Sequence, residues 1–276
     1  MAQYYNKINT LYKRGDKNQI IEGDFSMNEF AYLKNCLWET QEKLDGTNMS
    51  YHVFFDTELG AIKSTEIHGK TENAKIPEGL LIEMKKIFDP LVSYGHLTEK
   101  FKQVKTLDDG TVVISWPYKV VFYCEGYGAK IQGGGRYSPT EKFTVFDISV
   151  QGLEDAPEIY LLRDSVVDIC NKLHIDLVHS YGQMTINDAE KIIKDIANLV
   201  YTVGVNNITK DNLYKAGYDP YFIERMFSNH SIDKNLIIEG FVLKSPLGLM
   251  TRLGKPLVLK IKVKDYVDLL RKQNKK

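Results

Sequence analysis

The chain has 276 residues, of which 43% are hydrophobic and 26% charged, and its 36 Lys and Arg balance 36 Asp and Glu. This composition excludes a disordered, collagen-like or disulfide-rich chain, and the length suffices to bury a sizeable core. Residues 1–13 contain no apolar segment typical of a secretory signal, and no run is long enough to span a bilayer. We therefore expect a cytoplasmic globular protein without a membrane partner.

Cysteines and histidines give no pattern along the chain. Cys36, Cys124 and Cys170 form no close-spaced pair and are flanked by apolar residues, which predicts small buried side chains in a reducing compartment. The histidines are scattered without metal-ligand spacing, so we predict that none is a ligand: His52, His68, His96, His174, His179 and His230.

The elements are expected in the following chain order. A short helix near 27–34 precedes a strand at 37–42, which breaks at Asp45-Gly46, and a strand at 47–55 has its expected hairpin partner at 59–64. A helix follows Pro77, and β-rich runs at 120–125 and 143–150 flank a glycine-rich connection. Strands return at 236–244 and 257–263, before a closing helix at 266–271.

The segment at about 157–230 has a helical period, so β-rich segments lie on both sides of a helical insertion. This arrangement predicts an α+β fold instead of a regular alternation of strands and crossover helices. No internal repeat or linker is visible, and we expect a single domain over residues 1–276.

The strongest chemical signal is Glu42-Lys43-Leu44-Asp45-Gly46-Thr47-Asn48. Its K-x-D-G core is weak alone, because Asp-Gly is often only a turn. A lysine attacks phosphorus only as the neutral amine, so it needs a cationic or desolvated setting that lowers its pKa. The run resembles the nucleotide-attachment motif of polynucleotide ligases and mRNA guanylyltransferases, and its Thr-Asn ending is similar to the RNA ligases.

Four further segments follow in the order of that superfamily, and each resembles one of its motifs: Phe122–Gly126 (motif III), Phe143–Ile148 (aromatic-V-F-D-I), Glu239–Lys244 (E-G-x-V-x-K) and Lys260–Lys262 (K-x-K). Each has a structural alternative as a strand end, a core aromatic, a turn or the wet face of an edge strand. Four such segments in order rarely coincide, and together they favour the functional interpretation.

The resemblance implies a nucleotidyltransferase (ATP-grasp-like ligase core) fold, with antiparallel sheets flanked by helices, and an ATP-dependent RNA ligase. Lys43 would carry AMP, beside Lys260 and Lys262 at the α-phosphate, while Mg²⁺ or Mn²⁺ would bind at Glu239. Glu125 would bind the ribose and Phe143 would stack on adenine. The resemblance assigns further contacts with the nucleotide to Glu42, Leu44, Asn48, Lys63 and Lys244. The partner would be a nucleic acid with 5′-phosphate and 3′-hydroxyl ends, and RNA is expected in preference to DNA.

Two departures separate the chain from the double-strand-RNA-repair ligases, which it otherwise resembles most. Lys63-Ser64-Thr65 stands where those enzymes have Lys-Arg-Thr, so Lys63 takes over a phosphate contact or that function lies elsewhere. Only fourteen residues follow Lys262, which leaves no room for an OB or other C-terminal domain, so we expect that a partner protein could supply one.

Other functions remain open at this point. A DNA ligase with the same core and a non-catalytic nucleotide- or nucleic-acid-binding module are the alternatives. GTP and NAD⁺ are disfavoured, because capping enzymes and NAD⁺-dependent ligases normally carry further domains. Residues 251–276 hold nine Lys and Arg against Asp265 and Asp268, and together with the loop at Arg136 they are candidate contacts to a nucleic-acid backbone.

Overall fold

The structure is a computed structural model that describes residues 5–71, 73–132, 134–252 and 254–274. The chain divides into two compact units. Unit 1 contains Tyr5 and Gly46–Val178, and unit 2 contains Asn6–Asp45 and the chain from His179 onward. That the chain acts as one domain stays a prediction. Among the described helices, none combines the length and the apolar character needed to cross a membrane.

Unit 1 is built on a five-stranded sheet with the strand order β11-β10-β9-β5-β6. All the pairs within it are antiparallel. The elements of unit 1 are β5 (Thr47–Phe55), β6 (Ile62–Gly69), α2 (Glu78–Ser93), α3 (His96–Lys100), β7 (Gln103–Thr106), β8 (Val112–Ser115), β9 (Lys119–Tyr127), η1 (Gly134–Arg136), β10 (Lys142–Gln151), β11 (Ile159–Tyr160) and α4 (Arg163–Leu173).

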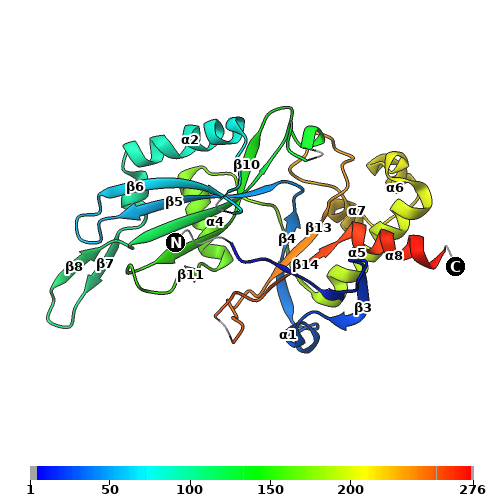
Figure 1. Cartoon of the computed structure of the whole chain (residues 1–276), viewed down its shortest axis with the longest axis horizontal. Coiled ribbons are helices and arrows are strands. Elements are labelled where there is room, and N and C mark those ends of the chain that lie inside the picture. The colour runs from blue at the N-terminus through cyan, green and yellow to red at the C-terminus, as the bar shows by residue number, and fades with distance from the viewer. Residues whose placement is uncertain (1–4, 72, 133, 253, 275–276) are drawn as a thin grey trace. The chain divides into compact units, whose positions relative to one another are not determined.

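Helix α2 covers one face of this sheet (Figure 1) because its apolar positions recur at helical spacing. Leu80, Met84 and Phe88 are fully buried, and Phe88 stacks on Tyr51 of β5 with ring centroids 4.0 Å apart. Since side chains alternate along a strand, the opposite face carries the polar positions of β5, such as Ser50. Each candidate residue of unit 1 therefore lies either on the face that α2 covers or on the opposite, polar face.

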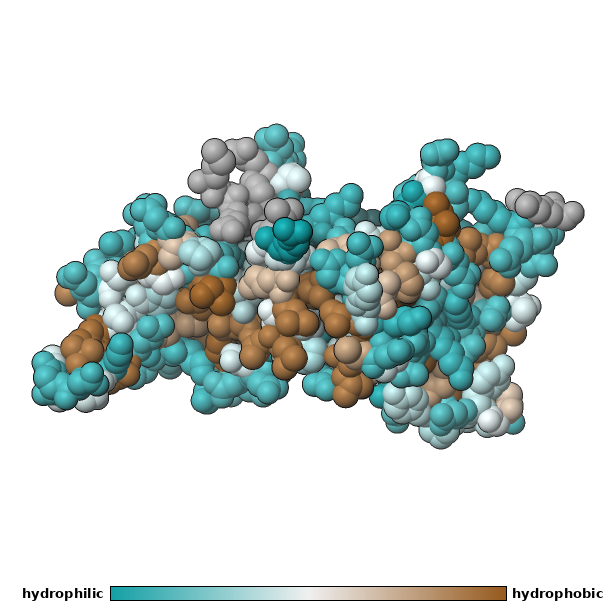
Figure 2. All heavy atoms as spheres, turned by 90° about the horizontal axis from the view of Figure 1, so that it is seen from below, coloured by the Kyte–Doolittle hydropathy of each residue, from teal (hydrophilic) through white to brown (hydrophobic). Residues whose placement is uncertain are grey.

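A second hairpin, β7–β8, leaves apolar side chains in solvent. Val104 and Val112 are 62% and 57% exposed, and Figure 2 shows apolar atoms at this tip of the molecule. The sequence analysis did not predict this hairpin.

Unit 2 is built on a five-stranded sheet with the order β1-β14-β13-β4-β12. Its elements are β1 (Asn9–Thr10), β2 (Tyr12–Arg14), β3 (Ile20–Phe25), α1 (Asn28–Tyr32), β4 (Leu37–Lys43), β12 (Ser180–Thr185), α5 (Ile186–Val203), η2 (Val205–Asn207), α6 (Lys210–Lys215), α7 (Pro220–Met226), β13 (Gly240–Lys244), β14 (Val258–Lys262) and α8 (Val263–Gln273). Phe241, Leu243, Leu259 and Ile261 alternate along β13 and β14 into a core that they share with α5.

A buried carboxylate links three segments of unit 2. Glu190 on α5 accepts hydrogen bonds from the hydroxyls of Tyr12 and Tyr266 at 3.0 and 2.9 Å, and Lys194 lies 2.9 Å from the same oxygen. Because Tyr12 is on β2 and Tyr266 is on α8, this network links an early strand and the last helix of unit 2 to α5.

The α+β class predicted from the sequence is confirmed, and β4, β5, β9, β10, β13 and β14 lie where strands were predicted. Three expectations were wrong in detail. The first forty residues contain strands as well as α1, β6 begins later and extends further than expected, and Cys36 is exposed. The segment at 157–230 is mostly helical, but it also contributes β11 and β12 to the sheets. Residues 133, 275 and 276, part of the predicted glycine run and basic tail, lie outside the described residues.

Candidate active site

Four lysines share one face of the sheet in unit 2. Directly paired residues of neighbouring strands point to the same face, so the register defines three rows across β4, β13 and β14. The rows are Lys43–Gly240–Lys262, Gln41–Val242–Lys260 and Glu39–Lys244–Val258. Three predicted motifs that are far apart in sequence are thereby brought onto one surface.

The carboxylate of Glu239 joins the two lysines of the first row. Lys43 Nζ lies 2.6 Å from Glu239 Oε2, and Lys262 Nζ lies 2.5 Å from Oε1. Lys43 also donates to the carbonyl of Leu44 at 3.2 Å. The side chains of Lys43 and Glu239 are 19% and 17% exposed, so this ion-pair network is accessible without being fully solvated.

Gly240 is required at the centre of this row. A Cβ there would lie 2.0 Å from the carbonyl oxygen of Ile261, and its φ of 158° is unfavourable for other residues. The missing side chain also leaves the position between Lys43 and Lys262 vacant, and the carboxylate of Glu239 reaches both amines. The Glu239-Gly240 pair is therefore required by the geometry of this row and is more than a turn.

Glu42 points away from this surface, because it is adjacent to Lys43 on a strand. Its side chain is buried and accepts hydrogen bonds from the hydroxyl of Ser228 at 2.5 Å and from the N–H of Asn229 at 3.0 Å. Burial raises the pKa of Glu42 to about 7, although these hydrogen bonds act in the opposite direction. The side chain of Glu42 therefore does not face the lysines, so it does not make the predicted contact with the nucleotide from their side of the sheet. Leu44 is also buried.

Unit 1 presents another row, in which Asn48 on β5 pairs with Glu125 on β9, and Glu125 pairs with Thr144 on β10. Gly46 belongs to the same region: a Cβ on it would lie 2.3 Å from the carbonyl oxygen of Gly126 and 3.0 Å from Cγ of Glu125. The glycine of K-x-D-G is thus needed for close packing against the predicted ribose-binding segment. Asn48 and Glu125 are direct partners in the register of β5 and β9, and the roles expected for them stay predictions.

Phe143 lies on the opposite face of this sheet. It pairs with Gly126 and not with Glu125, its side chain is 5% exposed, and its ring centroid lies 6.0 Å from that of Phe88 in the core. The adenine-stacking role expected for Phe143 is not supported by this geometry. The alternative considered for the aromatic run, a core aromatic, describes Phe143 better.

Lys63 is also distant from Asn48 and Glu125. Its neighbours on β5 are Phe54 and Phe55, about 20 Å along the strand from Asn48 at 3.3 Å per residue. It forms an ion pair with Asp56 at 3.4 Å. Lys70 directly follows the end of β6 at Gly69, and Gly69 pairs with Met49, the neighbour of Asn48 in sequence. The sequence analysis did not consider Lys70, which is followed directly by Thr71.

Two buried polar groups near these rows were not predicted. The side-chain nitrogen of Gln41, in the row of Lys260, and the hydroxyl of Thr144, in the row of Glu125, have no hydrogen-bond partner within the described part of the chain. Unsatisfied buried polar groups are uncommon and costly. A bound ligand with complementary polar atoms would satisfy them.

A basic pocket of about 710 Å³ adjoins Lys260 and Lys262 in unit 2. Arg14 is held by Asp265 through two hydrogen bonds of 2.8 and 3.0 Å. The charged residues of its lining are Lys7, Arg14, Lys17, Lys260, Lys262, Lys264, Arg271, Lys272, Asp265 and Asp268. This excess of positive charge favours an anionic ligand such as a phosphate.

The fold is the mixed α+β fold of the RNA ligase nucleotidyltransferases. The model of the RNA ligase family matches residues 37–262. The chain belongs to the RNA ligase family. Among curated proteins, none matches the sequence.

Solved structures of a Naegleria gruberi RNA ligase have a similar fold. The structure with pyrophosphate has a TM-score of 0.52 at 13% identity and covers 98% of this chain and 58% of its own. Two variants with ATP and Mn have TM-scores of 0.51 and 0.52 at 14% and 15% identity, and they cover 98% and 96% of this chain. This chain spans 64% and 62% of those two, so it matches only part of that ligase.

Proposed function

We propose that the chain is an ATP-dependent RNA ligase that forms a lysyl-AMP intermediate on Lys43. The observation that carries the proposal is the first lysine row, in which Glu239 holds the amines of Lys43 and Lys262. Family membership and the ATP bound to the Naegleria ligase variants support the same chemistry.

In the first step the amine of Lys43 would attack the α-phosphorus of ATP. A P–N bond forms, the P–O bond to pyrophosphate breaks, and the amine loses its proton. Lys260 and Lys262 would stabilise the charge that develops on the phosphate oxygens, since they share the face of Lys43. Glu125 would bind the ribose and Asn48 would contact the nucleotide, while Lys244 lies two rows from Lys43 and would have the least direct role.

A divalent cation fits the donor set of this surface. Glu239 offers two carboxylate oxygens, and Mg²⁺ or Mn²⁺ is commonly bound by one or two carboxylates together with waters and substrate phosphates. When bound, such an ion would shield the phosphate charge during nucleotide transfer. Glu239 would hold it.

In the later steps AMP would pass to a 5′-phosphate end, and a 3′-hydroxyl would displace AMP to seal the strand. We assign the backbone of the nucleic acid to the basic pocket beside Lys260. Because such contacts release counterions, binding should weaken as salt rises. Charge reversal at Lys17 and Lys264, which are outside the lysine rows, should reduce that salt dependence.

The first experiment is intact-mass spectrometry after incubation with ATP and Mg²⁺ or Mn²⁺. We expect an adduct of AMP mass on the wild-type chain and on Lys63→Ala, and none on Lys43→Ala or Lys43→Arg. An undiminished adduct in the Lys43 variants removes the proposal. Absence of any adduct with ATP, in a folded wild-type chain, favours the non-catalytic binding module.

The second experiment compares sealing of nicked RNA, nicked DNA and single-stranded RNA, each with a 5′-phosphate. Sealing of RNA substrates supports the assignment, whereas sealing of nicked DNA alone favours the DNA ligase alternative. If ATP fails with all three but pre-adenylylated ends are sealed, the middle step requires a partner protein.

A further inference from the structure

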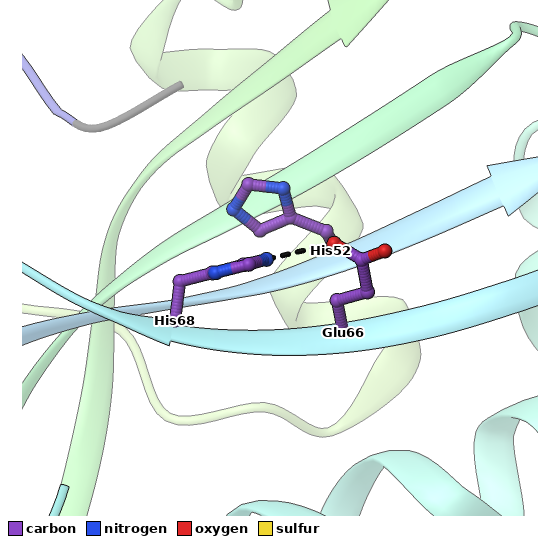
Figure 3. Close-up of side chains that lie close together, drawn as sticks. All are labelled: His52, Glu66 and His68. Atoms are coloured by element: carbon purple, nitrogen blue, oxygen red, sulfur yellow. Dashed lines mark hydrogen bonds and ion pairs between the residues drawn. The ribbon is translucent and has the colours of Figure 1, made fainter. Parts of the chain in front are cut away.

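Two histidines and a glutamate lie together on the β5–β6 hairpin of unit 1 (Figure 3). His52 pairs directly with Glu66, and His68 pairs with Ser50, so all four residues point to one face of the sheet. This is the face opposite to the α2 core. One ligand atom from each of His52, Glu66 and His68 lies within 4.8 Å of the others.

Spacing along the chain did not reveal this group, because its members come from two strands. The prediction that no histidine is a ligand rested on that spacing alone. Glu66 and His68 are two residues apart on β6, and strand alternation puts both on the face of His52.

The donor set selects a class of metal ion. Two imidazoles and one carboxylate suit Zn²⁺ and other borderline transition-metal ions, whereas Mg²⁺ and Ca²⁺ prefer oxygen ligands alone. Three protein ligands leave one position of a tetrahedral zinc ion for water. The group therefore differs in chemistry from the carboxylate of Glu239 in unit 2.

The geometry allows closure around an ion. Zinc with ligands at about 2.1 Å separates the ligand atoms by about 3.4 Å, so the side chains must approach by about 1.4 Å at most. His52 is buried and fixed, while the side chains of His68 and Glu66 are 24% and 48% exposed and have room to turn. His68 Nε2 already lies 2.8 Å from Glu66 Oε2, and the rings of the two histidines are 4.6 Å apart.

A supporting shell is also present. The hydroxyl of Ser50 lies 2.9 Å from Nε2 of His52 and restrains the orientation of the ring, as partners of metal-binding imidazoles do. The positive charge of nearby Lys119 is offset by Glu158, whose carboxylate lies 3.6 Å from its amine.

We infer that His52, Glu66 and His68 form a zinc-type transition-metal site. β6 is the edge strand of the sheet, and the ion would tie it to β5 by a cross-strand link. Because such an ion binds the folded hairpin and not the separated strands, it would stabilise unit 1.

The test uses the full chain without a histidine tag, in a Cys36→Ser background, since cysteine thiolates are zinc ligands and Cys36 is exposed. Zinc affinity is measured by competition with a chromogenic chelator in excess Mg²⁺, which blocks sites made of oxygen ligands. The unfolding temperature is measured with and without zinc. The variants Glu66→Gln and His68→Ala alter partly exposed ligands and leave the core intact, and His96→Ala is the matched control on an exposed histidine.

We expect one zinc ion per chain, an affinity about tenfold or more weaker in Glu66→Gln and His68→Ala, and a zinc-dependent rise in unfolding temperature that these two variants lose. His96→Ala should behave as the wild type does. Absence of stoichiometric zinc in the wild type overturns the inference, as does equal zinc affinity in His68→Ala, Glu66→Gln and His96→Ala. Neither result bears on the AMP adduct at Lys43.

Discussion

Lys43 Nζ lies 2.6 Å from Oε2 of Glu239, so the proposed nucleophile is engaged in an ion pair. An ammonium group has no free lone pair, so the amine must both lose a proton and leave the carboxylate before it attacks phosphorus. Glu239 also holds Lys262, which means that a single carboxylate restrains two of the cations proposed to act on the phosphate.

Replacing Glu239 should therefore separate amine reactivity from nucleotide transfer. In Glu239→Gln, acetylation of Lys43 by an amine-selective reagent should become about three- to tenfold faster, the equivalent of an ion pair of ~1 kcal/mol. AMP transfer should fall by about a hundredfold, because the carboxylate no longer orders the surface. Peptide mass spectrometry measures the labelling, with Lys244 as the internal reference. Unchanged or slower labelling of Lys43 would show that the ion pair does not restrain it.

Variants of Lys70 and Lys63 form a matched pair that tests which lysine takes over from the arginine that Ser64 replaces. Lys70 directly follows the end of β6 at Gly69, which pairs with Met49, and Lys63 is near the start of β6. Lys70→Ala should slow sealing of a 5′-phosphorylated nick by about tenfold, the effect of one hydrogen bond to a charged group, and Lys63→Ala should change it by less than about twofold. Sealing rates under single-turnover conditions test both variants. A larger loss in Lys63→Ala would restore the role expected from sequence.

Glu42 should make the folded protein less stable as the pH rises. Burial raises the pKa of its carboxyl from 4.5 to about 7, so the fold favours the protonated form. That contribution is fully present below pH 4.5 and is lost as the pH rises through 7, a difference of about 3 kcal/mol.

The neutral amide in Glu42→Gln cannot ionise and should remove this dependence. The unfolding free energy of the variant minus that of the wild type should increase from pH 5 to pH 8, measured by urea denaturation. Because other groups cancel in the difference, a value independent of pH would show that Glu42 does not titrate as described.

The Glu190 network should contribute to the stability of unit 2 without affecting the lysine rows. Glu190→Ala leaves the hydroxyls of Tyr12 and Tyr266 without their acceptor, and we expect a loss of about 2–4 kcal/mol in unfolding free energy. The triple variant Tyr12→Phe, Tyr266→Phe, Glu190→Leu should recover part of this loss, since the polar groups are removed together. Calorimetry measures both. No recovery in the triple variant would show that the loss comes from packing.

Much of the fold was accessible from local pattern. The strands that carry Lys43, Glu125 and Lys262 were predicted because apolar alternation and Asp-Gly or Glu-Gly breaks mark strands and their ends. The hairpin after β5 was placed too early. Its partner begins at Ile62 and continues to Gly69, so Lys63 lies at the start of this strand and Lys70 directly after its end.

The sequence by itself determined the family and the α+β class and indicated Lys43 as the proposed nucleophile, since these depend on residue order and short-range spacing. Only the tertiary structure decided which side chains share a face. The bulge between Val145 and Asp147 and the register shift at Phe54–Phe55 alter the alternation, and a shift of one residue reverses every side chain that follows. Pairing between strands, and not spacing along the chain, places Phe143 in the core and His52 beside His68.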